Sequence, residues 1–248
     1  MDREARRQVA HTLAQAWIVR RPIERLPPEL RPATDDEAHD IQDAMIEAIG
    51  QPIGGWKVGA KRPIRGARFA SGIVSTPAAV PGSDQHLRAI EGEVAFVFPY
   101  GLAPQANEYS RLEVAAAVQA CAAIEIVDSR YRDFPDVSEP EKLADLLSNG
   151  GLVQGPTVRD WQHLDFSTIG VELVIDGHTV LQRQGGHATG DPLNACLLFV
   201  NAMRMRGGVP AGSVVTTGTY TGMPRLESGS TAIVRFTGLG EAQLTFTI

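Results

Sequence analysis

The sequence predicts an α+β fold, because helical patterns gather early in the chain and strand patterns gather late. The two clearest helical patterns lie within residues 3–20 and 34–50. Short runs rich in Val, Ile, Phe and Thr dominate after residue 170, and the turn signal Asp176-Gly177 joins two of them. We therefore expect a small N-terminal helical subdomain at residues 1–52 and a strand-rich core at residues 53–248.

Composition excludes several classes of protein. The chain has 248 residues, a formal net charge of −6 and a hydrophobic content of 43%, which suit a globular protein and argue against a nucleic-acid surface. The sequence contains no run of 18 apolar residues, so no membrane span is predicted, and the N-terminus carries no signal-peptide pattern. Cys121 and Cys196 lack CxxC spacing, which predicts reduced, structural thiols and a cytoplasmic location.

The first two elements are predicted helices. In residues 3–20 apolar side chains recur every four positions, as on one face of an amphipathic helix. A proline-rich connector follows. A second helix is predicted to begin after Thr34, which with Glu37 fits a capping box, and to stop at Gly50.

Residues 53–75 are rich in glycine and carry five positive charges in an acidic protein. Those charges are Lys57, Lys61, Arg62, Arg65 and Arg68. The stretch is either a solvated loop or a cationic approach for an anionic substrate. Lys57 differs from the others because it lies between Trp56 and Val58 on an apparent strand. Burial there would lower its pKa toward neutrality, as a proton-transfer group requires.

Three glutamates lie on two predicted strands that are otherwise apolar. Glu91 and Glu93 are two positions apart and so share a face, while Glu125 stands between Ile124 and Ile126. Buried carboxylates are costly unless a positive charge neutralises them, and an all-oxygen site suits Mg²⁺ or Mn²⁺. The alternative is that these glutamates lie on a solvated outer face of an antiparallel sheet.

A helix opened by a second capping box, Ser110 with Glu113, is predicted between the two strands. Asp128 and Arg130 follow the second strand. Asp128 can hold a metal ligand or an arginine, and the planar fork of Arg130 can clamp a substrate carboxylate. Alternatively, the two side chains pair with each other near the surface.

The remainder of the chain is predicted as one irregular stretch followed by a strand-rich half. Residues 131–155 are expected to be irregular apart from a helix over 141–147. Residues 171–182 predict a tight hairpin, and His187 falls in a glycine-rich loop where a surface position is expected. A helix is predicted from Asp191 to about residue 206. The last predicted strands are 214–219, 232–236 and 242–248.

Five segments in order resemble the 2-keto-4-pentenoate hydratase group of the fumarylacetoacetate hydrolase superfamily, which includes 2-oxohept-4-ene-1,7-dioate hydratase and 4-oxalocrotonate decarboxylase. The segments are Gly55-Trp56-Lys57-Val58-Gly59, Glu91-Gly92-Glu93, Glu125-Ile126-Val127-Asp128-Ser129-Arg130, Gly190-Asp191-Pro192-Leu193-Asn194-Ala195, and Gly218-Thr219 with the glycines that follow. This resemblance covers nearly the whole chain. It implies a rolled, mixed β-sandwich as the catalytic core and a homo-oligomer of at least two chains.

The resemblance also implies a site. Glu91, Glu93 and Glu125 would hold Mg²⁺ or Mn²⁺, and Lys57 would move a proton or hold the substrate carboxylate. The candidate catalytic residues are Lys57, Asp128 and Arg130, and the candidate substrate-binding residues are Lys57, Arg130 and Thr219. Arg62, Arg65 and Arg68 are unranked candidates for a second substrate carboxylate.

The implied function is a metal-dependent hydratase that adds water to a 2-hydroxy-2,4-dienoate in aromatic meta-cleavage catabolism. The alternatives are a 4-oxalocrotonate-type decarboxylase, an acylpyruvase-type C–C hydrolase and an inactive partner subunit of a pathway enzyme. One departure motivates the last of these. Asn149 and Gly150 stand where the family pattern has Asp and Asn, and an asparagine cannot serve as a general base.

Overall fold

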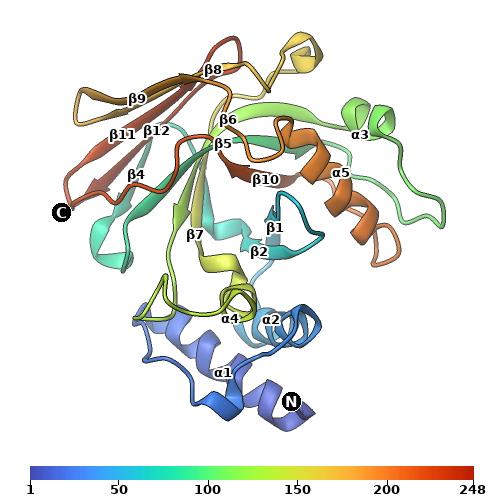
Figure 1. Ribbon diagram of the computed structural model, residues 1–248, viewed down its shortest axis with the longest axis vertical. Coiled ribbons are helices and arrows are strands. Elements are labelled where there is room, and N and C mark those ends of the chain that lie inside the picture. The colour runs from blue at the N-terminus through green and yellow to red at the C-terminus, as the bar shows by residue number, and fades with distance from the viewer.

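The computed structural model describes all residues 1–248, and its strands form two sheets (Figure 1). One sheet has seven strands in the order β2-β1-β10-β5-β6-β7-β3, and the other has five in the order β4-β12-β11-β8-β9. The strands are β1 (Ile53–Val58), β2 (Arg65–Phe69), β3 (Ile73–Ser75), β4 (Ala78–Pro81), β5 (Ala89–Phe98), β6 (Gln119–Val127), β7 (Asn149–Gln154), β8 (Gly170–Ile175), β9 (His178–Gln184), β10 (Ser213–Thr219), β11 (Thr231–Phe236) and β12 (Gly240–Thr247). The helices are α1 (Arg3–Val19), α2 (Asp35–Ile49), α3 (Arg111–Ala117), α4 (Glu139–Ala144) and α5 (Pro192–Met203).

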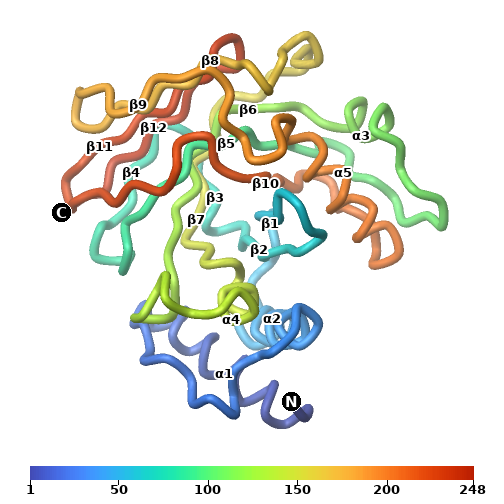
Figure 2. Tube along the Cα trace, in the orientation of Figure 1, coloured from blue at the N-terminus to red at the C-terminus, as the bar shows by residue number.

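The two sheets pack on each other as a mixed β-sandwich, with β12 and β11 lying over β6. Strand pairing is parallel between β1 and β10, between β3 and β7, and between β4 and β12, and antiparallel elsewhere. Figure 2 shows β3 beside β7 at the edge of the larger sheet. The predicted α+β class and sandwich core are therefore confirmed.

The N-terminal helices form a layer with α4 at one end of the sandwich (Figure 1). Asp2 caps α1, and the Thr34 hydroxyl accepts a hydrogen bond from the Glu37 amide at 3.2 Å to cap α2. The reciprocal bond of the predicted capping box is absent, because the Glu37 carboxylate accepts from the amide of Ala33 instead. Gly50 ends α2 in the left-handed conformation, with φ of 68°.

A single buried cluster runs through both layers. Leu13 of α1 and Met45 of α2 belong to the same hydrophobic core as Phe96 of β5 and Leu244 of β12. Burial of these apolar faces holds the helical layer to the sandwich. The division into residues 1–52 and 53–248 stays a prediction.

Some element boundaries differ from those predicted. Strands β2 and β7 occupy stretches expected to be a loop and an irregular segment, because their glycines and charged side chains hide the strand pattern. The helix predicted over residues 141–147 is α4, which begins at Glu139 after the capping residue Ser138 and ends at Ala144. Residues Leu146, Leu147 and Ser148 have positive φ, so the helix cannot continue through them.

Other predicted elements are confirmed. The β8–β9 hairpin turns at Asp176-Gly177 with both φ values positive, and α3 opens on a complete capping box formed by Ser110 and Glu113. Helix α5 ends at Met203, about one turn earlier than predicted. Both cysteines are buried and free. None of the helices is both long enough and apolar enough to cross a lipid bilayer.

Candidate metal centre and active site

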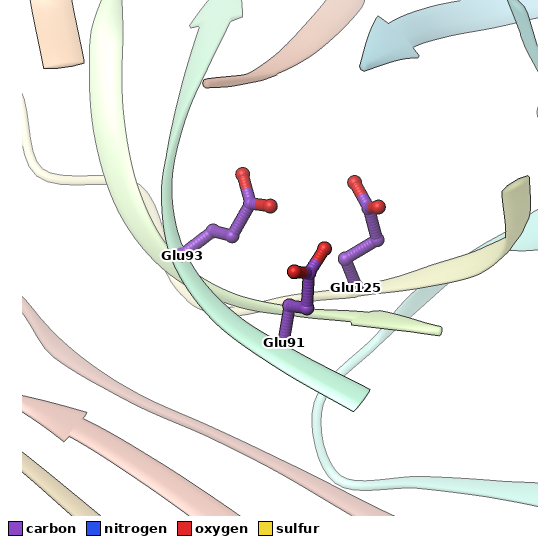
Figure 3. Close-up of side chains that lie close together, drawn as sticks. All are labelled: Glu91, Glu93 and Glu125. Atoms are coloured by element: carbon purple, nitrogen blue, oxygen red, sulfur yellow. The ribbon is translucent and has the colours of Figure 1, made fainter. Parts of the chain in front are cut away.

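The three glutamates predicted as metal ligands meet on one face of the larger sheet. Strand alternation places Glu91 and Glu93 of β5 on the same side, and antiparallel register places Glu125 of β6 directly opposite Glu91. One carboxylate oxygen of each lies within 4.8 Å of the others. Figure 3 shows the three carboxylates projecting to the same side of the two strands.

The cluster is buried, which excludes the solvated outer face as its explanation. Glu93 and Glu125 are 2% and 0% exposed, and Glu91 is partly buried. Burial raises the pKa of Glu91 to about 7, against the opposing charge of Lys57. Burial, reinforced by the charges of Glu125 and Glu91, raises the pKa of Glu93 well above its usual range. Three buried carboxylates that repel one another and converge with hard oxygen donors fit a divalent cation such as Mg²⁺ or Mn²⁺.

Glu93 is held by backbone groups of β10. Its Oε2 atom accepts hydrogen bonds from the amides of Thr217 and Gly218 at 2.9 and 2.8 Å. The β5–β10 pairing shifts register between Thr216 and Thr219, and this irregularity turns both amides toward Glu93. Gly218 adopts a φ of 119° there, a conformation that favours glycine.

Lys57 lies beside the cluster, as the sequence predicted. It stands on β1, opposite Thr216 of the parallel strand β10, and its ammonium forms an ion pair with Glu125 Oε1. The predicted fall in its pKa is wrong for this arrangement. Burial disfavours the charged amine, but the attraction of Glu125 and Glu91 outweighs burial and raises the pKa of Lys57.

Arg68 is the residue of the cluster that the sequence failed to single out. It is fully buried on β2, and its Nη2 donates to Glu125 Oε2 at 2.6 Å. With Lys57 it outweighs the effect of burial and lowers the pKa of Glu125. The other two arginines considered with it bind carboxylates of α2, Arg62 at Asp35 and Arg65 at Asp43. The available signal was the position of Arg68 between Ala67 and Phe69 in an apolar run.

Arg130 is bound by groups of the protein and also lines a cavity of about 550 Å³, so its role as a substrate clamp stays a prediction. Its Nε pairs with the buried carboxylate of Asp145, its Nη2 donates to the Asp145 carbonyl at 2.9 Å, and its Nη1 donates to the Asn149 carbonyl at 2.7 Å. The alternative prediction, that Arg130 pairs with Asp128, is wrong, because the ion-pair partner of Arg130 is Asp145. All three nitrogens of its fork are occupied by protein.

Asp128 lies apart from the three glutamates. Its Oδ1 accepts a hydrogen bond from the Leu87 amide at 2.8 Å. Together with Ile126 and Gly150 it lines a cavity of about 550 Å³, to which none of the three glutamates contributes. The structure therefore does not bring Asp128 to the carboxylate cluster.

Two further residues lie beside the Glu93-binding turn: Thr219 of β10 and His187 of the loop before α5. Thr219 pairs in register with Glu93, but its hydroxyl donates to the Gly222 carbonyl at 3.0 Å within a turn. His187, expected at the surface, is 6% exposed, and its Nε2 donates to the Thr217 carbonyl at 2.8 Å. Burial lowers the pKa of His187, whose ring packs behind the turn of Thr217 and Gly218 that binds Glu93.

Comparison with known proteins identifies relatives of this chain. The chain matches no protein-family model. A 2-keto-4-pentenoate hydratase of Burkholderia vietnamiensis (strain G4 / LMG 22486) is 31% identical over 193 residues, covering 77% of this chain and 72% of that protein. A second relative, 2-keto-4-pentenoate hydratase 2 of Dechloromonas aromatica (strain RCB), is 28% identical over 242 residues and covers 91% of each chain.

Solved structures agree with the sequence relatives. The 4-oxalocrotonate decarboxylase from Pseudomonas putida G7, complexed with magnesium and adipate, superimposes with a TM-score of 0.86 at 25% identity, covering 99% of this chain and 98% of that one. Fumarylpyruvate hydrolase from Pseudomonas aeruginosa shares the fold, with a TM-score of 0.58 at 15% identity, covering 78% of this chain and 88% of that one.

The fold is shared with the fumarylacetoacetate hydrolase from psychrophilic Exiguobacterium antarcticum, with a TM-score of 0.57 at 16% identity, covering 81% of this chain and 76% of that one. The chain belongs to the group of 2-keto-4-pentenoate hydratases and 4-oxalocrotonate decarboxylases, as its resemblance implied. The curated relatives of the chain are enzymes.

Proposed function

We propose that the chain is a divalent-metal-dependent hydratase that adds water to a 2-hydroxy-2,4-dienoate in aromatic meta-cleavage catabolism. The observation that carries this proposal is the buried cluster of Glu91, Glu93 and Glu125 beside Lys57, in a chain whose relatives are named as hydratases. Mg²⁺ or Mn²⁺ is the expected cation, and magnesium is bound by the solved decarboxylase relative.

Glu91, Glu93 and Glu125 would hold the cation through their facing oxygens. When bound, the cation supplies an electron-withdrawing centre that favours the enolate form of a 2-oxo acid. The sheet fixes the ligands before substrate arrives, because the amides of Thr217 and Gly218 orient Glu93.

Lys57 is the expected proton-transfer residue. A cation held by the glutamates would offset the negative charge that raises the pKa of Lys57 in the metal-free cluster. Its ammonium reaches the cluster from β1, where it can bind the substrate carboxylate or move a proton between the enol oxygen and a substrate carbon. The oxygen of water then adds at C4 of the conjugated acid and a proton is returned to carbon. The proposal assigns no step to Asp128 or Arg130, whose side chains contact the Leu87 amide and Asp145, and their catalytic roles stay predictions.

A 4-oxalocrotonate-type decarboxylase is the second candidate. It is favoured by the similarity of the whole chain to the solved decarboxylase and by a curated decarboxylase of Pseudomonas sp that is 33% identical over 138 residues, covering 55% of this chain and 53% of that protein. Loss of CO₂ from such a substrate needs the same enolate stabilisation as hydration does. A C–C hydrolase and an inactive partner subunit are the other alternative functions. We also expect the chain to form a homo-oligomer of at least two chains.

Product mass spectrometry tests the proposal. The purified chain with Mg²⁺ or Mn²⁺ is given 2-hydroxypenta-2,4-dienoate and, separately, 4-oxalocrotonate. We expect gain of water by the first substrate. Loss of CO₂ from the second, with the first unchanged, would favour the decarboxylase. Turnover of neither substrate by protein that binds the cation would contradict both and favour the hydrolase or the partner subunit.

A further inference from the structure

A buried arginine connects the carboxylate cluster to the rest of the fold. Arg68 is fully buried on β2 and directs its guanidinium at three side chains. Its Nη2 donates to Glu125 Oε2 at 2.6 Å, its Nε to Asn149 Oδ1 at 3.2 Å, and its Nη1 to Thr216 Oγ1 at 3.4 Å. An arginine buried this completely must have all its partners within the protein.

These contacts make the two oxygens of Glu125 unequal. Oε2 accepts from Arg68 and also from the Thr216 hydroxyl, at 2.7 Å. Oε1 receives no well-aligned hydrogen bond and has only the ion pair with Lys57. One oxygen is therefore held by two donors, while the other is left with the ammonium of Lys57.

We propose that Arg68 is a positioning residue that holds Glu125 Oε2 so that Oε1 is presented to the cation. Glu125 would then ligate through one oxygen in a fixed orientation. This inference rests on the proposed function, because it presupposes that the three glutamates bind a divalent ion. Partners of ligating groups orient those ligands and contribute to metal affinity in this way.

A series of buried hydrogen bonds holds Arg68 in place. The side chain of Asn149 accepts from Arg68 and donates to the Ala67 carbonyl at 3.1 Å, so it cannot rotate freely. The Asn149 carbonyl accepts from Arg130, which is paired with Asp145. Asn149 thus holds an arginine, and three contacts connect Arg130 to the cluster through Asn149 and Arg68.

The competing explanation is that Arg68 only balances charge. The two explanations predict effects of opposite sign. Removing a positive charge near a cation site should by itself tighten cation binding. Removing the group that fixes a ligand should weaken cation binding.

The experiment measures Mn²⁺ affinity by the loss of the free-ion paramagnetic resonance signal on binding. The variants are Arg68→Met, which removes the charge and the donors, and Thr216→Val, which removes the neutral donor to Oε2 and one acceptor of Arg68 without changing the charge. Arg62→Met is the matched control, because Arg62 pairs with Asp35 at the surface in the same basic stretch. Thermal melts establish that each variant is folded.

We expect Arg68→Met to bind Mn²⁺ about tenfold to a hundredfold more weakly than the wild type. Thr216→Val should show a smaller loss in the same direction, and Arg62→Met should show none. Unchanged or tighter binding in folded Arg68→Met would overturn the inference. If Arg68→Met does not fold, unchanged binding in Thr216→Val would overturn it.

The wild-type titration separates this inference from the proposed function. A wild-type chain that binds no Mn²⁺ contradicts the metal site itself. A wild-type chain that binds Mn²⁺, together with an Arg68→Met variant that binds equally well, contradicts only the positioning role.

Discussion

At the scale of single residues, the site is a balance of buried charges. Three carboxylates face Lys57 and Arg68, so the metal-free cluster keeps an excess of one negative charge when all five groups are ionised. A divalent cation would reverse that excess and leave one positive charge for an anionic substrate. This charge complementarity suits a substrate that carries a carboxylate next to an enol.

Replacement of Lys57 by Met should separate catalysis from metal binding. We expect turnover to fall by about a hundredfold to ten-thousandfold, because the ammonium that moves the proton is lost. Mn²⁺ should bind at least as tightly, since a repelling charge has been removed. Steady-state kinetics and Mn²⁺ titration measure the two effects.

Lys61→Met is the control for this variant, because Lys61 is exposed in the loop that follows β1. It should behave as the wild type. Turnover within about tenfold of the wild type in Lys57→Met would contradict the assigned role, since proton-transfer groups contribute more than that.

The pH dependence of metal binding follows from Glu91. Burial raises its pKa to about 7, from 4.5 in an unperturbed chain. Between these values the unfolded chain has released the proton while the folded, metal-free chain retains it. The stability that this group gives the metal-free fold is therefore present below 4.5 and is lost as the pH rises toward 7.

A cation must displace that proton, so Mn²⁺ binding should tighten as the pH rises through about 7. The tightening should continue above that value, because burial also raises the pKa of Glu93. Below that value, affinity should change by up to about tenfold per pH unit for each proton displaced. Titrations in matched buffers across this range measure the slope. A flat profile between pH 6 and 8 would contradict the raised pKa of Glu91.

At the scale of elements, the close approach of β1 and β10 positions Lys57. Gly55 lies opposite Val214 of β10, and a Cβ at Gly55 would fall 2.0 Å from the Val214 carbonyl oxygen. Only glycine allows the two strands to pair here. Lys57 is two residues along the same strand and opposite Thr216, so any separation of the strands would move its ammonium.

Gly55→Ala should therefore lower the free energy of unfolding by about 3 kcal/mol. It should also lower turnover, because separation of the strands moves the Lys57 ammonium. The matched control is Gly72→Ala, because its added Cβ would meet nothing closer than 3.9 Å. Denaturant unfolding of the two variants gives the comparison. Equal stabilities would show that β1 can shift away from β10 without cost.

Sequence patterns predicted the elements whose signals are local. Strand alternation predicted that Glu91 and Glu93 share a face, and β5 confirms it. Strand β2 was missed because Arg68, buried in the fold, reads as a solvated charge in the sequence. The partner of Arg130 was missed because Asp145 lies 15 residues further along the chain, at the C-terminal end of α4, and no periodicity reveals that this end packs against Arg130.

At the scale of the whole molecule, the helical layer and the sandwich share one core. Leu13 of α1 is fully buried in the same cluster as strands that carry the site. Asp145, the C-cap residue of α4, is also where the buried contacts that lead to Arg68 begin. Unfolding of the N-terminal layer should therefore also disrupt the carboxylate cluster.

Leu13→Ala should lower the free energy of unfolding by about 2–5 kcal/mol, because it leaves a cavity in this shared core. We expect a single unfolding transition in which Mn²⁺ binding and helical structure are lost at the same denaturant concentration. Leu112→Ala, at an exposed position of α3, is the control and should change little. Two separate transitions, with the metal site surviving the first, would contradict a shared core.

Activation of the metal-stripped chain by Mn²⁺ tests the central claim most directly. The chain is titrated with Mn²⁺ in the presence of 2-hydroxypenta-2,4-dienoate, and water addition is followed alongside bound metal. We expect no turnover without metal, a rise in proportion to bound Mn²⁺ up to one ion per chain, and neither binding nor turnover in Glu93→Gln. Turnover by the metal-free chain, or by Glu93→Gln, would contradict a reaction carried by this carboxylate cluster.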